Sequence, residues 1–278
     1  MLFAVLLIVD SLHFVFARAL LPHLPAEMSS FLVLGIAAVE VGIYQMGRGG
    51  IRLGVFRANW KFFTTIGLLV AVSTVLNYAA VAVIDPGTAS LLSKTGVLFS
   101  VGLGILWLNE RLRRVEVIGA VLSIIGVFVI GFQPVELLWL GSIMVLTSTF
   151  LYALHGAVVK KYGEEMDFGD FFFFRIASIA LFLFIYVLGA NKLVMPDRTA
   201  WLLVIVAGTV DVVISRSLYY LSLRRMPITI HTIILTVSPV VTIIWGVILF
   251  DTLPSRVTLL GGVLVMIGVA IVTLQRRR

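Results

Sequence analysis

The chain alternates long apolar stretches with short polar or breaker-rich segments along its whole length. Ten apolar stretches fall at 2–19, 29–47, 60–84, 87–109, 115–132, 138–158, 171–190, 200–223, 227–250 and 257–274. Most come close to the ~20 residues that a helix needs to cross a bilayer core about 30 Å thick. They are too long for barrel strands, and a helix satisfies its own backbone in hydrocarbon. The pattern predicts an all-α integral membrane protein with ten transmembrane helices.

Composition agrees with this prediction. The chain has 278 residues, of which 60% are hydrophobic and 13% charged, and its mean hydropathy is +1.12. A soluble domain is about 25% charged, and a soluble fold of this length could not hide so much apolar side chain. Cysteine is absent, which excludes thiol chemistry and a disulfide scaffold. A cytosolic enzyme and a disordered chain are excluded as well.

The net charge of +7 is shared unevenly between the two sets of alternate loops. One set holds only Arg18, Lys192, Arg198 and Arg256. The other set, with the C-terminal tail, holds Arg48, Arg52, Arg57, Lys61, Arg111, Arg113, Arg114, Lys160, Lys161, Arg224, Arg225, Arg276, Arg277 and Arg278. The positive-inside rule then places both termini in the cytoplasm, and we expect a multi-pass protein of the plasma (inner) membrane. The basic balance therefore implies contact with membrane lipids and no nucleic-acid partner.

The two halves of the chain resemble each other at an offset of 141–142 residues. The matches are His13 with His155, Arg18 with Lys160, Gly67 with Gly208, Tyr78 with Tyr219, Pro86 with Pro227, Gly119 with Gly261 and Gly126 with Gly268. We expect one five-helix repeat over 1–134 and a second over 135–278. Because five is odd, the second repeat is inverted in the membrane, an arrangement typical of secondary transporters. The alternative is an old duplication that adds only stability.

Two segments carry a resemblance to a known family. Residues 87–96 read Gly-Thr-Ala-Ser-Leu-Leu-Ser-Lys-Thr-Gly, and Glu110, Gly119 and Gly126 follow. Together with Ser238-Pro239 and the later glycines of the second half, this pattern resembles the drug/metabolite transporter superfamily, in its EamA-type branch. The resemblance covers nearly the whole chain. It implies a ten-helix permease that moves small metabolites, often amino acids or related solutes, across the plasma membrane.

The chain departs from the family pattern at three places. The second repeat has Pro239 in the fourth-helix position, whereas the first has Thr95-Gly96. The Glu110 position becomes Asp251-Thr252 in the second repeat. Asp10 stands where a Trp is common in the family.

Ionisable side chains inside the apolar stretches need a reason, because each costs at least ~2.5–3.5 kcal/mol at the centre of a membrane helix. They are Asp10, His13, Glu40, Lys94, His155, Arg175, Asp211, Arg216 and His231. We expect them to pair with one another or to line a wet cavity. Arg175, just after a run of four phenylalanines, is expected to snorkel to the cytoplasmic surface.

Lys94 and Asp211 are the strongest candidates for substrate binding. Lys94 lies near mid-depth and could hold an anionic group, the alternative being an ion pair, for instance with Asp211. Ser215 and Tyr219 follow Asp211 at i+4 and i+8, so the three are expected to share one face that lines the cavity. Arg216 is expected to point about 100° around the helix from this face. Three roles are open for it: it could bind a carboxylate or phosphate of the substrate, pair with an acidic residue, or reach the lipid headgroups.

Two further pairs have candidate roles. Asn77 and Tyr78 match the neighbourhood of Tyr219 in the second repeat, which suggests hydrogen-bonding walls or, alternatively, helix packing. Asp10 and Glu40 could carry protons, the alternative being ion pairs with Lys94 or Arg175.

His13 and His155 occupy matching positions in the two repeats, as gate residues would. The alternative for both is a hydrogen-bonded core histidine.

Glycines concentrate in the fifth and tenth helices, which carry few polar groups: Gly119, Gly126, Gly261, Gly262 and Gly268. Small residues allow close helix packing. We expect these helices to lie outside the cavity or to form a homodimer through helices five and ten.

The sequence therefore predicts a secondary transporter, exporter or facilitator, of a small polar molecule, not an enzyme, with no cofactor and no metal. A zwitterion such as an amino acid would place its carboxylate on Lys94 or Arg216 and its amine on Asp211 or Asp10. A phosphorylated, nucleotide-linked or lipid-linked solute is the alternative, and phosphate requires two or more converging cations. Alternative hypotheses from another functional class are a membrane enzyme and a non-transporting scaffold.

Overall fold

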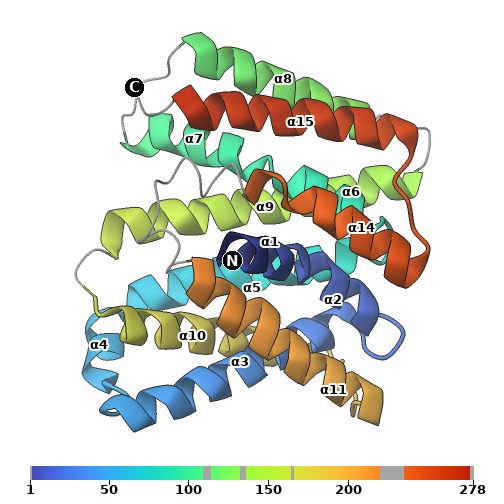
Figure 1. Cartoon of the computed structure of the whole chain (residues 1–278). Helices are drawn as coiled ribbons and strands as arrows, with labels where there is room; N and C mark the ends of the chain where they lie inside the picture. The colour runs from blue at the N-terminus through green and yellow to red at the C-terminus, as the bar shows by residue number, and fades with distance from the viewer. Residues whose placement is uncertain (1, 109–113, 132–135, 164–165, 220–234, 276–278) are drawn as a thin grey trace.

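A computed structural model gives the structure of the protein, and it describes residues 2–108, 114–131, 136–163, 166–219 and 235–275. Every element in these ranges is a helix (Figure 1). The first half contains α1 (Leu2–Ser11), α2 (His13–Leu20), α3 (Ala26–Arg48), α4 (Leu53–Ala58), α5 (Trp60–Ala80), α6 (Pro86–Ser93), α7 (Gly96–Leu108) and α8 (Arg114–Gly131). The second half contains α9 (Glu136–Tyr162), α10 (Phe168–Gly189), α11 (Arg198–Ala207), the π-helix η1 (Gly208–Ile214), α14 (Ser238–Phe250) and α15 (Arg256–Gln275).

Eight helices of the described chain are long and apolar enough to cross a membrane. They are Ala26–Arg48, Trp60–Ala80, Pro86–Trp107, Arg114–Gly131, Leu138–Tyr162, Phe168–Gly189, Arg198–Tyr219 and Arg256–Leu274. These match eight of the predicted stretches, and the prediction of an all-α membrane protein is confirmed. The first stretch is divided into α1 and α2, and only residues 235–250 of the ninth, which include α14, lie among the described residues.

Two predicted stretches are not continuous helices. The first is interrupted at Leu12, and the fourth at Lys94 and Thr95. A hydroxyl at each interruption bonds back to the backbone: Ser11 Oγ donates to the Ile8 carbonyl (2.6 Å) and Thr95 Oγ1 to the Leu92 carbonyl (2.7 Å). Such local bonds compete with the helical ladder. Both interruptions lie at or next to an ionisable residue, His13 in the first stretch and Lys94 in the fourth.

The third helix also ends earlier than predicted, at Ala80 instead of residue 84. A turn follows, and Asp85 then caps α6 by accepting a hydrogen bond from the Thr88 amide (2.8 Å) and another from the Thr88 hydroxyl. Pro86 occupies the first turn, where its missing N–H costs nothing. The Asp85-Pro86 pair therefore fixes where the fourth span begins.

Helices α8 and α15 lie side by side along one edge of the molecule, at the top of Figure 1. A Cβ built on Gly119 would lie 2.7 Å from the Gly268 carbonyl oxygen, and one on Gly126 would lie 2.5 Å from that of Gly261. The contacts are therefore exchanged between the repeats. Gly119 contacts Gly268, which is the sequence match of Gly126, and Gly126 contacts Gly261, which is the sequence match of Gly119. A pseudo-two-fold axis between two copies of one helix produces this exchange.

The glycines of the fifth and tenth helices therefore join the two repeats within one chain. Ser123 strengthens this contact, because its hydroxyl donates to the Val265 carbonyl (3.2 Å). A homodimer would have to use the outward faces of α8 and α15, and it stays a prediction.

The remaining helices surround the centre of the molecule. α5 packs against α9 and α10, and α10 packs against α3. Two hydroxyls, of Ser73 on α5 and Ser148 on α9, lie 2.9 Å apart, and each donates to the other's carbonyl. These buried reciprocal bonds hold α5 and α9 together beside the central cavity described next.

Candidate functional site

A polar cavity of about 230 Å³ lies between the two halves of the chain. Its polar and charged lining comes from α1, α2, α5, α6, α9, α10 and the η1 region: Asp10, His13, Ser73, Thr74, Asn77, Ser93, Lys94, Ser148, Thr149, Tyr152, Arg175, Asp211 and Arg216. Six candidates from the sequence are thus brought together here, namely Asp10, His13, Asn77, Lys94, Asp211 and Arg216. A cavity of this size has room for several waters or one small solute.

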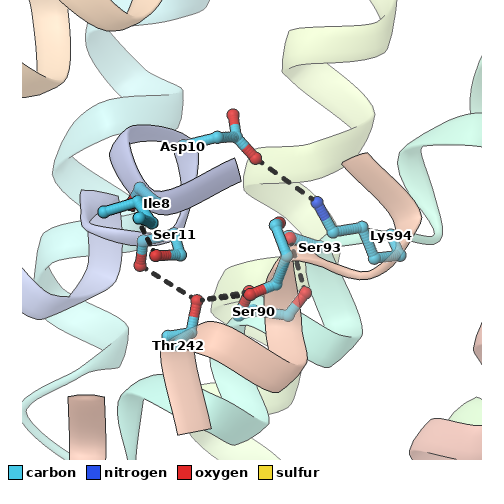
Figure 2. Close-up of polar contacts among 8 residues, drawn as sticks. Ile8, Asp10, Ser11, Ser90, Ser93, Lys94 and Thr242 are labelled. Carbon is cyan, nitrogen blue, oxygen red and sulfur yellow. Dashed lines mark hydrogen bonds and ion pairs between the residues drawn. The ribbon is translucent and has the colours of Figure 1, made fainter. Parts of the chain in front are cut away.

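Asp10 and Lys94 face each other across this cavity (Figure 2). The Lys94 Nζ lies 3.8 Å from the Asp10 Oδ2, and the side chains are 17% and 18% exposed. This distance makes an ion pair but exceeds hydrogen-bond range. Lys94 therefore pairs with Asp10 and not with Asp211, and the two charged groups are not joined by a hydrogen bond.

The backbone that carries this pair is fixed by a hydroxyl network (Figure 2). The Thr242 hydroxyl on α14 is within 2.9 Å of the Ser11 carbonyl and 3.2 Å of the Ser90 hydroxyl. Thr242 therefore connects the end of α1, next to the interruption at Leu12, with α6, which ends at the interruption at Lys94. Thr242, from the second repeat, thus helps to position both Asp10 and Lys94, which belong to the first repeat.

His13 and Asp211 form the second pair. His13 Nδ1 lies 2.8 Å from Asp211 Oδ2, and Asp211 is 3% exposed. A carboxylate only accepts, so Nδ1 donates. The Tyr78 ring lies edge-on to His13, with 6.0 Å between centroids. Two buried oxygens, Asp211 Oδ1 and Tyr78 Oη, have no hydrogen-bond partner among the described residues.

The residues after Asp211 do not lie as predicted. Arg216 lines the central cavity with Asp211, whereas Ser215 is 1% exposed and does not line it. The cause is the π-helix Gly208–Ile214. Hydrogen bonds in a π-helix run from i to i+5, so the residue five positions on takes the place that i+4 has in an α-helix. The predicted face of Asp211, Ser215 and Tyr219 was therefore wrong.

Arg175 also lies differently from its prediction. It is 4% exposed and lines the central cavity, so it does not snorkel. Its Nε donates to His155 Nε2 (3.2 Å) and its guanidinium Nη2 to the Tyr152 hydroxyl (3.4 Å). Asp167 caps α10 and starts it at Phe168, three residues before the predicted start. This cap was the signal in the sequence, because a helix that begins at Phe168 places Arg175 roughly 10 Å from its start.

A second cavity of about 770 Å³ adjoins the central one and shares Ser93, Lys94, Thr149 and Tyr152 with it. It extends to Lys160 near the end of α9 and to Thr273 near the end of α15. Tyr219 lines this cavity and not the central one. The two cavities together lead from the centre toward the end of the molecule where the basic residues gather.

Glu40 lies apart from the central cavity. Thr209 donates to its Oε1 (2.6 Å), and Glu40 lines a separate cavity of about 780 Å³ beside Arg48, Arg52 and Asp170. Arg52 there lies 2.6 Å from the buried Asp170. Neither Lys94 nor Arg175 pairs with Glu40, so that alternative was wrong.

Some predicted features fall outside the described residues, including His231 and Glu110. Within the described ranges, no group of three or more His, Cys, Asp or Glu side chains could hold a metal ion.

A charged cavity between the two halves of a helical membrane protein is an arrangement typical of secondary transporters. The profile of the EamA-like transporter family matches residues 1–132 and 139–274, and the chain belongs to this family of the drug/metabolite transporter superfamily. The predicted resemblance is confirmed.

Two individual proteins are similar to it. The uncharacterized transporter YdfC of Bacillus subtilis (strain 168) is 24% identical over 196 residues, which are 69% of this chain and 64% of that protein. This match thus spans less than two thirds of the relative's length. One solved crystal structure covers 100% of this chain and 97% of its own, with a TM-score of 0.70 and 20% identity. That likeness shows the fold.

Proposed function

We propose that this transporter moves small polar metabolites such as amino acids across the plasma membrane by alternating access, with both termini in the cytoplasm. One observation carries the proposal: the central cavity is lined by charged residues of both halves of the chain, Asp10, Lys94, Arg175, Asp211 and Arg216. Inverted-repeat transporters bind their substrate between the repeats and rock around it.

The pairs in the cavity support a zwitterionic substrate. The Asp10–Lys94 pair is 3.8 Å long and makes no hydrogen bond, so opening it costs little direct bonding. A substrate carboxylate would replace Asp10 at Lys94 or bind Arg216, and an ammonium group would take Asp10 or Asp211. Each charged group of the substrate then pairs with an opposite charge of the protein, and neither Asp10 nor Lys94 is left buried without a partner.

The interruptions near Leu12 and Lys94 supply the hinges that alternating access needs. A few residues at the ends of elements absorb such motions. Thr242 touches both interrupted spans, which couples them. The adjoining cavity leads toward Lys160 on the basic end, which supports a path for the solute between the centre and the cytoplasmic side.

The test is counterflow in proteoliposomes at two pH values, with labelled amino acids, sugar phosphates and nucleobases. We expect accumulation of one class, lost in Lys94→Ala and Asp211→Asn and retained in the exposed control Arg198→Gln. A folded wild-type protein that accumulates nothing would contradict the proposal and favour a membrane enzyme or a scaffold. Unchanged counterflow in both cavity variants would contradict the assigned site.

A phosphorylated or otherwise anionic solute is the second candidate. The specific observation is that three cationic side chains, Lys94, Arg175 and Arg216, line the same cavity as only two carboxylates. The sugar phosphates in the panel test it directly.

A further inference from the structure

Arg175 stands out among the charges of the central cavity by its partners. Asp10 pairs with Lys94, and Asp211 pairs with His13. Arg175 donates only to His155 Nε2 and to the Tyr152 hydroxyl, and across the described residues no carboxylate lies within 4.0 Å of it. A ring nitrogen that accepts is unprotonated, so His155 is neutral and the buried guanidinium forms no ion pair with any described residue.

A buried cation without an anion is costly, and proteins seldom keep one without a use. Arg175 is 4% exposed, and its residual surface faces the central cavity. We propose that Arg175 binds the anionic oxygens of the transported solute, a carboxylate or a phosphate. This inference rests on the proposed transport function and names the residue that recognises the anionic group of the substrate.

The partners of Arg175 orient it for this role. Tyr152 and His155 lie three residues apart on α9 and hold Nε and Nη2, which fixes the plane of the guanidinium. The other terminal nitrogen, Nη1, makes no hydrogen bond within the described chain and is left for an oxyanion. A guanidinium held in this way has lost its rotamer freedom before the solute arrives, which favours binding.

A second guanidinium approaches the same place. The Arg216 Cζ lies 5.9 Å from the centre of the Tyr152 ring, whose hydroxyl accepts from Arg175. Tyr152 therefore lies between two cations from different helices. An oxyanion bound at Arg175 therefore also gains from the positive charge of Arg216 nearby, which predicts that solutes with an oxyanion bind far more tightly than analogues without one.

The experiment compares matched probes on purified protein. Leucine, 3-methylbutylamine and 4-methylpentanoate separate the carboxylate from the amine, and glucose 6-phosphate with glucose tests phosphate. Binding is measured as the ligand-induced rise in unfolding temperature and as counterflow. We expect binding only of probes with an oxyanion, about ten- to hundredfold weaker in Arg175→Gln and unchanged in the exposed control Arg198→Gln.

Arg175→Lys is the second variant, for the case that Arg175→Gln does not fold. Lysine keeps the charge but not the fork, so we expect it to weaken oxyanion binding at least tenfold. Equal affinity in wild type and in either folded Arg175 variant would overturn the inference. A wild-type protein that counterflows only probes without an oxyanion would also overturn it and leave the transport proposal standing. A wild type that counterflows no probe would instead overturn transport itself.

Discussion

His13 and Asp211 join the two halves of the molecule across the central cavity, with 2.8 Å between Nδ1 and Oδ2. One residue follows the interruption of the first span, and the other lies in the π-helix of the eighth. The turn at Leu12 and the π-helix thus meet in one polar contact. This contact places a first-repeat side chain against the most buried carboxylate of the site.

The first prediction concerns this contact. Removing the hydrogen-bond partner of a buried polar group typically costs about 1–3 kcal/mol, and His13 is 22% exposed on its side chain, so we expect His13→Ala to lower the free energy of unfolding by about 2 kcal/mol. The double variant His13→Ala/Asp211→Asn should regain part of this loss, because no unpaired carboxylate remains. Thermal unfolding of the purified protein measures both. A double variant as unstable as the sum of the single ones would show that the two residues do not interact.

The second prediction tests the register of the π-helix. Because the chain has no cysteine, a single introduced thiol is the only site for a water-soluble thiol reagent. We expect Arg216→Cys, on the cavity, to react at least tenfold faster than Ser215→Cys, which is buried. Faster reaction at position 215 would indicate a regular α-helix through residues 208–214.

The third prediction concerns the contact between α8 and α15. A Cβ on Gly126 would lie 2.5 Å from the Gly261 carbonyl oxygen and 2.8 Å from the Val265 amide, and backbone cannot give way as a side chain can. We expect Gly126→Ala to destabilise the protein by about 1–3 kcal/mol. Gly102→Ala on α7 is the matched control, since nothing lies within 4 Å of its Cβ. Equal unfolding temperatures for the two variants would contradict the backbone contact.

The fourth prediction is a pH dependence outside the membrane spans. Asp197 caps α11, and hydrogen bonds from the Ala200 amide and from His23 lower the pKa of its carboxyl from the ordinary value of 3.8. A lowered folded-state pKa contributes stability that is complete above the unfolded value and is lost as the pH falls through the folded value. The destabilisation by Asp197→Ala should therefore be constant above about pH 5 and shrink below pH 3.8. Unfolding temperatures across this range measure it, and a difference that grows in acid would refute the assigned cause.

Much of the fold could be predicted from hydropathy, because a membrane helix must be apolar over its whole length. The interruptions could not, since they depend on hydroxyls such as those of Ser11 and Thr95 that compete locally with the ladder. The depth of Arg175 was missed because the cap at Asp167 moves the helix start by three residues.

The sequence predicted many of the residues that form the site, but it did not predict which of them pair with each other. The cost of charge in lipid singled out Asp10, Lys94 and Asp211 correctly as residues that need partners. Their actual partners come from helices that lie side by side only after folding, and no periodicity within one helix encodes such contacts. The π-helix adds a further step, because it rotates everything after Asp211 while leaving the sequence pattern unchanged.

The glycine contact has a consequence for how the protein is made. α15 leaves the ribosome after every other described helix, yet it is the partner of α8, which is synthesised with the first repeat. Until α15 is in place, the surface of α8 at Gly119 and Gly126 must face lipid or the insertion machinery. The contact between the repeats therefore forms only after α15 is made, and a chain that stalled before residue 256 would leave the packing face of α8 uncovered.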